Sequence, residues 1–303
     1  MKRIGKAVGA AVLVVVIAAG AFFVWANVAA SGRRGVIYDV HAVELPGERG
    51  PEAVARGEHL ATSRYACVEC HGRDLGGGTM VDAMPVGRFF GPNLTRGKGG
   101  VVGGYTSTDW DHIVRHGVKR DGTGALMPSK DFVHMSDREL ADLVAYVESM
   151  PPVDREMPAL QLGPLGTVLV ATGELELAAA EIEDHHRAHP AEPPPTGETV
   201  EFGRHLTVVC RGCHGADLSG GPIAGGDPAW PPAANLTPHA DGLRSWSRDD
   251  FLNAMLHARS KDGRALKMPM SNLTQYAAKA TPTELNAMWA FLQSLSPKPT
   301  ARP

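Results

Sequence analysis

Two copies of the pentapeptide Cys-x-x-Cys-His constrain this chain more than any other feature. They occupy residues 67–71 and 210–214 and contain all four cysteines of the 303 residues. Two thiols one helical turn apart can each bond one vinyl group of a porphyrin, and the imidazole that follows can ligate its iron, so the pattern indicates covalent haem. A redox dithiol or half a zinc site is the alternative for a bare Cys-x-x-Cys. The thiols predicted to hold two haem c groups are Cys67, Cys70, Cys210 and Cys213.

The N-terminus predicts the compartment. Lys2, Arg3 and Lys6 precede an uncharged stretch over residues 7–32, which is long enough to cross a bilayer. The positive residues are expected to stay in the cytoplasm. We therefore predict a single-pass anchor over residues 1–36 in a bacterial cytoplasmic membrane, with the haem-binding part in the periplasm. A signal peptide cleaved near Ala30 is the alternative. The formal charge of −3 and the absence of a basic patch do not indicate nucleic acid binding.

The two motifs belong to a longer internal repeat. The matching pairs are Gly57-Glu58-His59-Leu60 with Gly203-Arg204-His205-Leu206, Asn93-Leu94-Thr95 with Asn235-Leu236-Thr237, His116 with His257, and Met127-Pro128 with Met268-Pro269. The repeat predicts one domain over residues 50–153 and a second over 198–297. Between them, residues 154–197 are bounded by prolines, which is typical of a linker.

Each repeat is predicted to be helical. A first helix, carrying Gly57 or Gly203, ends at the haem motif, and a middle helix covers residues 108–116 or 249–257. A closing helix begins with a capping-box pattern at residues 136–139 or 281–284. The two glycines are expected to allow close packing of the first helix against the closing helix. The predicted fold class is all-α: short helices and loops around covalent haem, in two tandem domains after the transmembrane helix.

The axial ligands follow from the motifs and the repeat. His71 and His214 are the predicted proximal ligands. Met127 and Met268 are the predicted sixth ligands, because both precede proline at the same place in the repeat. A thioether ligand favours ferrous iron and raises the reduction potential.

Several alternatives stay open. Met270 competes with Met268, and in the first repeat Met80, Met84 and Met135 are weaker candidates. His116 and His257 are repeated as well, but their place on the middle helix favours packing or contact with a propionate.

Other polar and aromatic residues have expected structural roles. Asn93 and Asn235 are expected to tie down a loop near the haem edge through side-chain hydrogen bonds. Trp110 and Trp246 either contact haem or belong to the core. The run at residues 184–189 contains three histidines and could bind a metal, but it lacks cysteine and regular ligand spacing, which favours a solvated polar turn.

These motifs give the chain a resemblance to the class I cytochrome c fold, twice over. It resembles membrane-anchored dihaem cytochromes c of bacteria, and it is similar to the multihaem cytochrome subunits of periplasmic alcohol, aldehyde and gluconate dehydrogenases. The resemblance covers residues 50–153 and 198–297. It implies haem proteins that exchange electrons with redox partners.

The expected function is electron transfer and not catalysis. The electron donor would be a dehydrogenase or a quinol-oxidising complex, and the acceptor a terminal oxidase or a soluble cytochrome. A dihaem peroxidase is the enzymatic alternative, but it needs one iron with an open sixth position, which paired methionines disfavour. A haem-based sensor is a third possibility, although no signalling domain is attached.

Overall fold

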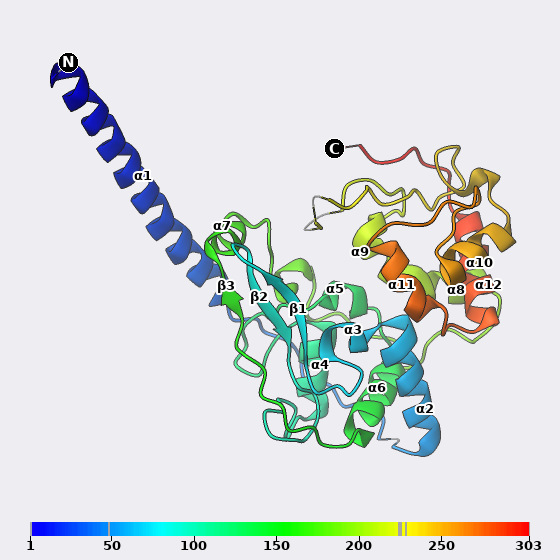
Figure 1. Cartoon of the computed structure of the whole chain (residues 1–303). Helices are drawn as coiled ribbons and strands as arrows, with labels where there is room; N and C mark the ends of the chain where they lie inside the picture. The colour runs from blue at the N-terminus through cyan, green and yellow to red at the C-terminus, as the bar shows by residue number, and fades with distance from the viewer. Residues whose placement is uncertain (1, 48, 224–225, 228, 303) are drawn as a thin grey trace.

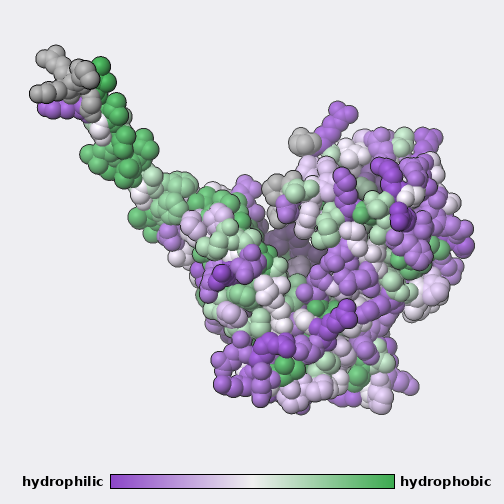
Figure 2. Space-filling view, viewed as in Figure 1, coloured by the Kyte–Doolittle hydropathy of each residue, from purple (hydrophilic) through white to green (hydrophobic). Residues whose placement is uncertain are grey.

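The computed structural model describes residues 2–47, 49–223, 226–227 and 229–302. Its first element is the long helix α1 (Lys2–Arg34), which projects from the body of the molecule (Figure 1). Residues 6–34 form a helix long and apolar enough to cross a membrane. Apolar side chains line its projecting part (Figure 2), and those of residues 12–17 are 57–67% exposed. The predicted anchor therefore forms one continuous helix.

Unit 1, residues 50–153, contains five helices. They are α2 (Pro51–His59), α3 (Cys67–His71), α4 (Ser107–Arg115), α5 (Ser129–Phe132) and α6 (Asp137–Ser149). A π-helical turn, Leu60–Arg64, continues α2 toward the first Cys-x-x-Cys-His motif. Leu60, Trp110, Leu140 and Val144 belong to the core between these helices.

Unit 2, residues 198–297, repeats this arrangement. Its helices are α8 (Val200–Leu206), α9 (Arg211–His214), α10 (Arg248–His257), α11 (Met270–Ala277) and α12 (Pro282–Ser294), with 3-10 turns at Thr207–Cys210 and Leu243–Ser245. Phe202, Phe251, Leu285 and Phe291 are among its core residues. The all-α prediction is confirmed for both units.

The helix starts that the sequence predicts are present. Ser136 and Glu139 form a reciprocal capping box at α6, and Thr281 and Glu284 form the equivalent box at α12. Each pair satisfies backbone N–H groups that would otherwise lack a partner in the first turn.

The predicted glycine contacts are also present. A Cβ atom added to Gly57 on α2 would lie 1.9 Å from the carbonyl oxygen of Asp142 on α6. A Cβ atom added to Gly203 on α8 would lie 1.9 Å from the carbonyl oxygen of Ala287 on α12. Only glycine therefore permits the observed approach of the first and closing helices in either unit.

The segment between the units is folded onto unit 1. Unit 1 contains an antiparallel hairpin of β1 (Gly78–Ala83) and β2 (Gly87–Gly91), and β3 (Gln161–Leu162) adds to β2 with Gly87 opposite Leu162. This small sheet is an addition that the sequence analysis does not predict. Next come α7 (Pro164–Thr172), which packs against the end of α1 near Ala26 and Ala30, and a 3-10 turn at Ala178–Glu181.

The two units dock through two equivalent contacts, one made by a histidine of each unit with a glutamate of the other. The Nε2 atom of His59 on α2 lies 2.8 Å from Oε1 of Glu284, the capping-box glutamate of α12. The Nε2 atom of His205, the equivalent residue on α8, lies 2.8 Å from Oε1 of Glu139 on α6. Each unit thus gives the same imidazole and the same carboxylate to its neighbour, as in a two-fold symmetric interface.

Two short helices extend this symmetry to the Cys-x-x-Cys-His motifs. On α11, Asn272 donates a hydrogen bond to Glu69 within the first motif, with 2.8 Å between Nδ2 and Oε1. On α5, the Asp131 carboxylate lies beside Gly212 in the second motif, 2.8 Å from where a glycine Cβ would stand. Each motif is therefore contacted by the other unit.

The buried carboxylate of Glu139 is held ionised at this interface. Its burial raises the pKa, but the hydrogen bond with His205 and the charge of Arg64 outweigh burial and bring the pKa to about 2, from an ordinary 4.5. On the other side, the hydrogen bond to Glu284 raises the pKa of His59 against the opposing effect of burial.

Replacing Gly57 with alanine should destabilise unit 1 by about 3 kcal/mol, since the new methyl group meets a backbone carbonyl and not a flexible side chain. Thermal unfolding followed by circular dichroism measures the effect. Gly103→Ala is the matched control, because an added Cβ has no neighbour within 4 Å there. Equal melting temperatures of the two variants would contradict the close helix contact.

Replacing Glu139 with glutamine should cost about 2 kcal/mol of stability at pH 7, as expected for hydrogen bonds to a charged group. The lowered pKa of Glu139 contributes stability that is full above pH 4.5 and is lost as the pH falls through about 2. The difference in melting temperature between wild type and Glu139→Gln should therefore shrink as the pH falls from 4.5 to about 2. Glu148 lies on the same helix as Glu139 and forms a partly exposed ion pair with Arg49, so Glu148→Gln should change stability little at any pH.

Candidate haem-binding sites

The histidine of each motif is held by one backbone hydrogen bond. Nδ1 of His71 donates to the Pro92 carbonyl at 2.9 Å, and Nδ1 of His214 donates to the Ala234 carbonyl at 2.7 Å. A carbonyl only accepts, so the neutral ring carries its proton on Nδ1 and presents an unprotonated Nε2. Burial lowers the pKa of both imidazoles, which keeps them neutral and able to bind a metal at pH 7.

The asparagines after these carbonyls fix the loop, as predicted. Asn93 is fully buried; its Oδ1 accepts from the backbone N–H and the hydroxyl of Thr95, both at 2.8 Å. Its Nδ2 donates to the carbonyl of Val153, beyond the closing helix, at 2.7 Å. Asn235 makes the same set of contacts, to Thr237 and to the carbonyl of Lys298. Each asparagine thus positions the carbonyl that orients the adjacent histidine.

None of the four cysteines, two in each motif, forms a disulfide. Burial raises the pKa of the Cys67 and Cys210 thiols to about 12, and it also raises those of Cys70 and Cys213. Catalytic dithiols have lowered pKa values, because the thiolate is the reactive form. Paired thiols followed directly by a neutral imidazole fit the attachment of haem c.

A buried donor without a partner supports the same fit. Trp110 is 5% exposed, and its Nε1–H has no hydrogen-bond partner among the described residues. A haem propionate would supply the missing acceptor, since buried donors are normally paired. In unit 2 the equivalent residue is Phe251, which lacks a donor, while Trp246 packs against the core. The two sites therefore differ at this position.

The candidate sixth ligands lie in different surroundings. Met127 is half-buried and packs against the core of unit 1, whereas Met268 is 47% exposed. Met270 is the first residue of α11. Of the weaker candidates, Met135 is buried in the core and Met84 is 61% exposed, while Met80 lies on β1. The assignment of Met127 and Met268 as ligands stays a prediction.

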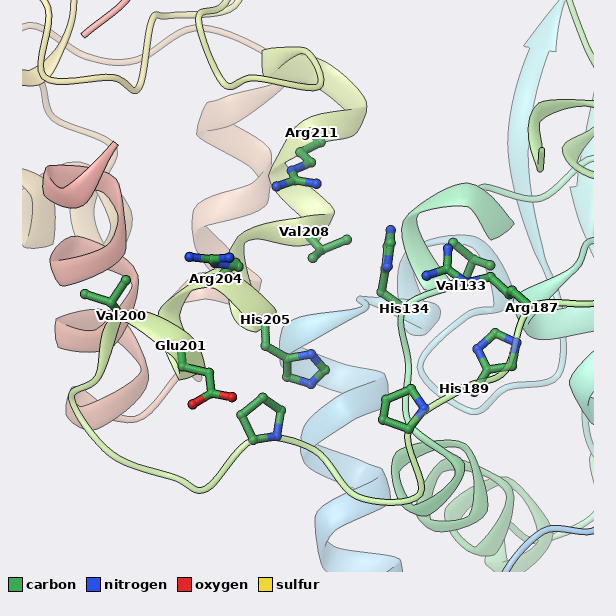
Figure 3. Close-up of a pocket in the computed structure, with 12 residues that line it drawn as sticks. Val133, His134, Arg187, His189, Val200, Glu201, Arg204, His205, Val208 and Arg211 are labelled. Carbon is green, nitrogen blue, oxygen red and sulfur yellow. The ribbon is translucent and has the colours of Figure 1, made fainter. Parts of the chain in front are cut away.

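A cavity of about 750 Å³ opens where unit 1, the connecting segment and unit 2 meet (Figure 3). His134, Arg187, Arg204 and Arg211 line it, together with the carboxylate of Glu201. Arg211 stands between the cysteines of the second motif, and its Nε has no partner among the described residues. The cavity is therefore basic and borders the second haem site.

One expectation is wrong for two residues of the connecting segment. Residues 184 and 186–188 are exposed, as a solvated turn requires, but His185 and His189 turn inward. Their rings lie 5.4 and 5.3 Å from that of His116, which is fully buried. The histidine-rich run was the available signal, but its partner His116, which directly follows α4, is about seventy residues away in the sequence, and no spacing rule joins them.

Comparison with known protein families agrees with this geometry. Residues 52–147 match the family described as cytochrome c oxidase, cbb3-type, subunit III. Residues 200–296 match the cytochrome c family. The two matches correspond to units 1 and 2, and each contains one Cys-x-x-Cys-His motif.

Among similar proteins is the fructose dehydrogenase cytochrome subunit of Gluconobacter japonicus, 27% identical over 81% of this chain and 53% of that subunit. The cytochrome c subunit of a quinone-dependent alcohol dehydrogenase from Gluconacetobacter polyoxogenes is 26% identical over 78% and 54%. The gluconate 2-dehydrogenase cytochrome c subunit of Pantoea cypripedii is 28% identical over 81% and 60%. The chain thus spans little more than half the length of these relatives. With two matched domains and two haem motifs, it belongs to the cytochromes c and carries two covalently attached haem c groups.

Proposed function

We propose that this protein carries electrons between its two haems as part of a membrane-bound dehydrogenase complex, and that it is not the catalytic subunit. The observation that carries the proposal is the reciprocal docking of the units, which joins Glu69 of one haem motif to α11 and places Gly212 of the other against α5. Haem iron supplies the one-electron chemistry by alternating between the ferrous and ferric states. A shared interface at both motifs favours transfer within the molecule.

The residues of each unit have separate tasks in this proposal. Cys67 and Cys70 hold the first haem and Cys210 and Cys213 the second, while His71 and His214 bind the irons through Nε2. Met127 and Met268 occupy the sixth positions and exclude small ligands, which suits electron transfer rather than oxygen chemistry. The domain boundaries that we propose are residues 50–153 and 198–297, with 1–36 as the anchor and 154–197 as the connection.

Helix α1 is the basis for the proposed location of the protein at the membrane. We propose that α1 stays as a membrane anchor with the haem units on the periplasmic side. The burial of Ala26 and Ala30 against Val170 and Ala171 supports retention, since cleavage near Ala30 would uncover that apolar contact. Arg33 also donates to the Ala171 carbonyl, with 3.2 Å from Nε to the oxygen.

The partners in this proposal come from the relatives. Three of them are named as cytochrome subunits of fructose, alcohol and gluconate dehydrogenases, which supports a dehydrogenase as the electron donor. We propose a terminal oxidase or a soluble cytochrome as the acceptor. Anchoring would confine encounters with a membrane-bound donor to the membrane surface.

Carbon monoxide distinguishes a carrier from a peroxidase. Visible spectra of the reduced, detergent-extracted protein should not change when carbon monoxide is added, because both irons are expected to have six ligands. A shift of the spectrum of one haem would reveal an open sixth position and favour the enzymatic alternative.

Replacing Met127 with histidine should lower the reduction potential of one haem by on the order of 0.1 V, since axial ligand identity is a principal control of haem potentials. Met84→His, at an exposed position, is the control and should leave both potentials unchanged. Redox titration of the purified protein measures the effect. In unit 2, Met268→His should lower the other potential and Met270→His should not; the reverse pattern would assign the ligand to Met270.

A further inference from the structure

A group of two buried and one half-buried polar side chains lies on the side of unit 1 covered by the connecting segment. Asp111 lies on α4 and His116 directly follows that helix, and both are fully buried. His189 comes from the connecting segment and reaches the same point; it also lines the cavity drawn in Figure 3. One ligand atom from each of the three residues lies within 4.8 Å of the other two. None of these residues belongs to a Cys-x-x-Cys-His motif or is a candidate sixth ligand of a haem iron.

The carboxylate of Asp111 has one oxygen without a partner. Oδ1 accepts a hydrogen bond from Nε of Arg115, whereas Oδ2 has no hydrogen-bond partner among the described residues. Oδ2 faces Nε2 of His116 at 3.6 Å, too far for a hydrogen bond. A fully buried carboxylate oxygen in this state is unfavourable unless a cation or a donor occupies the space in front of it.

The neighbouring imidazoles do not supply the missing donor. Nε2 of His185 donates to the Ala179 carbonyl at 3.1 Å, so its Nδ1 presents a lone pair to Nδ1 of His116, 3.3 Å away. If His116 gives its single proton to that contact, its Nε2 presents a lone pair to Asp111 Oδ2. If the proton of His116 is instead on Nε2, the lone pairs on Nδ1 of His116 and Nδ1 of His185 face each other. A neutral His116 cannot satisfy both sides.

Protonation of His116 does not resolve this conflict. Burial lowers the pKa of His116 to about 3, and the nearby His189 and His185 act in the same direction. Burial also lowers the pKa of His189 to about 3, followed by the charge of Arg115. A neutral imidazole with one unprotonated nitrogen is the form that binds metal ions.

The distances suit a tetrahedral metal ion. Two ligand nitrogens bound to zinc at 2.0–2.1 Å lie about 3.3–3.4 Å apart. The Nε2 atoms of His116 and His189 are 3.3 Å apart, and Asp111 Oδ2 is 3.6 Å from the first of them. Arg115 on Oδ1 and Ala179 behind His185 provide the outer hydrogen bonds that usually orient residues at a metal site.

We propose that Asp111, His116 and His189 bind a divalent transition-metal cation, for which Zn²⁺ is the best fit. Two imidazoles and a carboxylate are preferred zinc ligands. The metal site would have a structural role, because it ties the connecting segment to unit 1. Residues 190 and 191 follow directly, and their carbonyls accept hydrogen bonds from the backbone N–H groups in the first turn of α6. The metal site would thereby fix the path of the chain into unit 2.

The repeat provides a matched control within the same chain. His257 stands at the position of His116 in unit 2, but Leu252 replaces the carboxylate of Asp111, and His257 is exposed. His186, also exposed, is a second control next to the proposed ligands in the connecting segment. Neither residue should contribute to metal binding.

Metal analysis of the full-length haem-loaded protein tests the proposal. After incubation with zinc chloride and desalting, wild type should retain one zinc per two haem irons. His189→Gln should bind zinc at least tenfold more weakly, while His257→Gln and His186→Gln should match wild type. Zinc retained by His189→Gln, lost in His186→Gln, or missing from wild type would overturn the proposal.

A spectroscopic measurement on wild type avoids any effect of the substitutions on folding. Zinc-edge X-ray absorption should show nitrogen and oxygen neighbours at about 2.0–2.1 Å with no sulfur at about 2.3 Å. A sulfur signal would instead place the zinc on the cysteines and overturn the proposal. Removal of zinc by a chelator should also speed proteolytic cleavage within residues 184–197, and an unchanged cleavage rate would contradict the structural role.

Discussion

The crossing of the first and closing helices is the contact on which each unit depends. At Gly57 and at Gly203 the backbone of one helix touches a carbonyl of the other, at a distance that no Cβ allows. This crossing sets the direction of the chain as it leaves the first helix and enters the Cys-x-x-Cys-His motif. The position of the histidine in each motif, and of the loop whose carbonyl orients it, follows from that direction.

The same elements are used a second time to join the units. His59 and His205 lie two residues after the crossing glycines and bond the capping-box glutamates of the opposite unit. Those glutamates therefore start a helix in their own unit and hold the neighbouring unit. Because both contacts come from one repeat, the interface is nearly symmetric, and each haem motif is contacted by the other unit. The internal repeat therefore accounts both for the fold of each unit and for the docking of the two units.

Prediction from the sequence succeeded where the signal is local. The capping boxes at Ser136 and Thr281 need only residues three apart, and the asparagine loops need residues two apart. It did not predict the third strand at Gln161–Leu162 or the inward turn of His189. Both depend on contacts with residues about seventy positions away, which no periodicity in the chain reveals.

The sequence alone determined that this protein holds two covalent haems in two helical units, because the spacing of the thiols and the repeated motifs can be read directly along the chain. Only the tertiary structure decided how those units face one another, where the connecting segment lies, and that His116, His189 and Asp111 converge. Such arrangements depend on which buried surfaces and polar groups fit together, and that is settled by packing across the whole molecule.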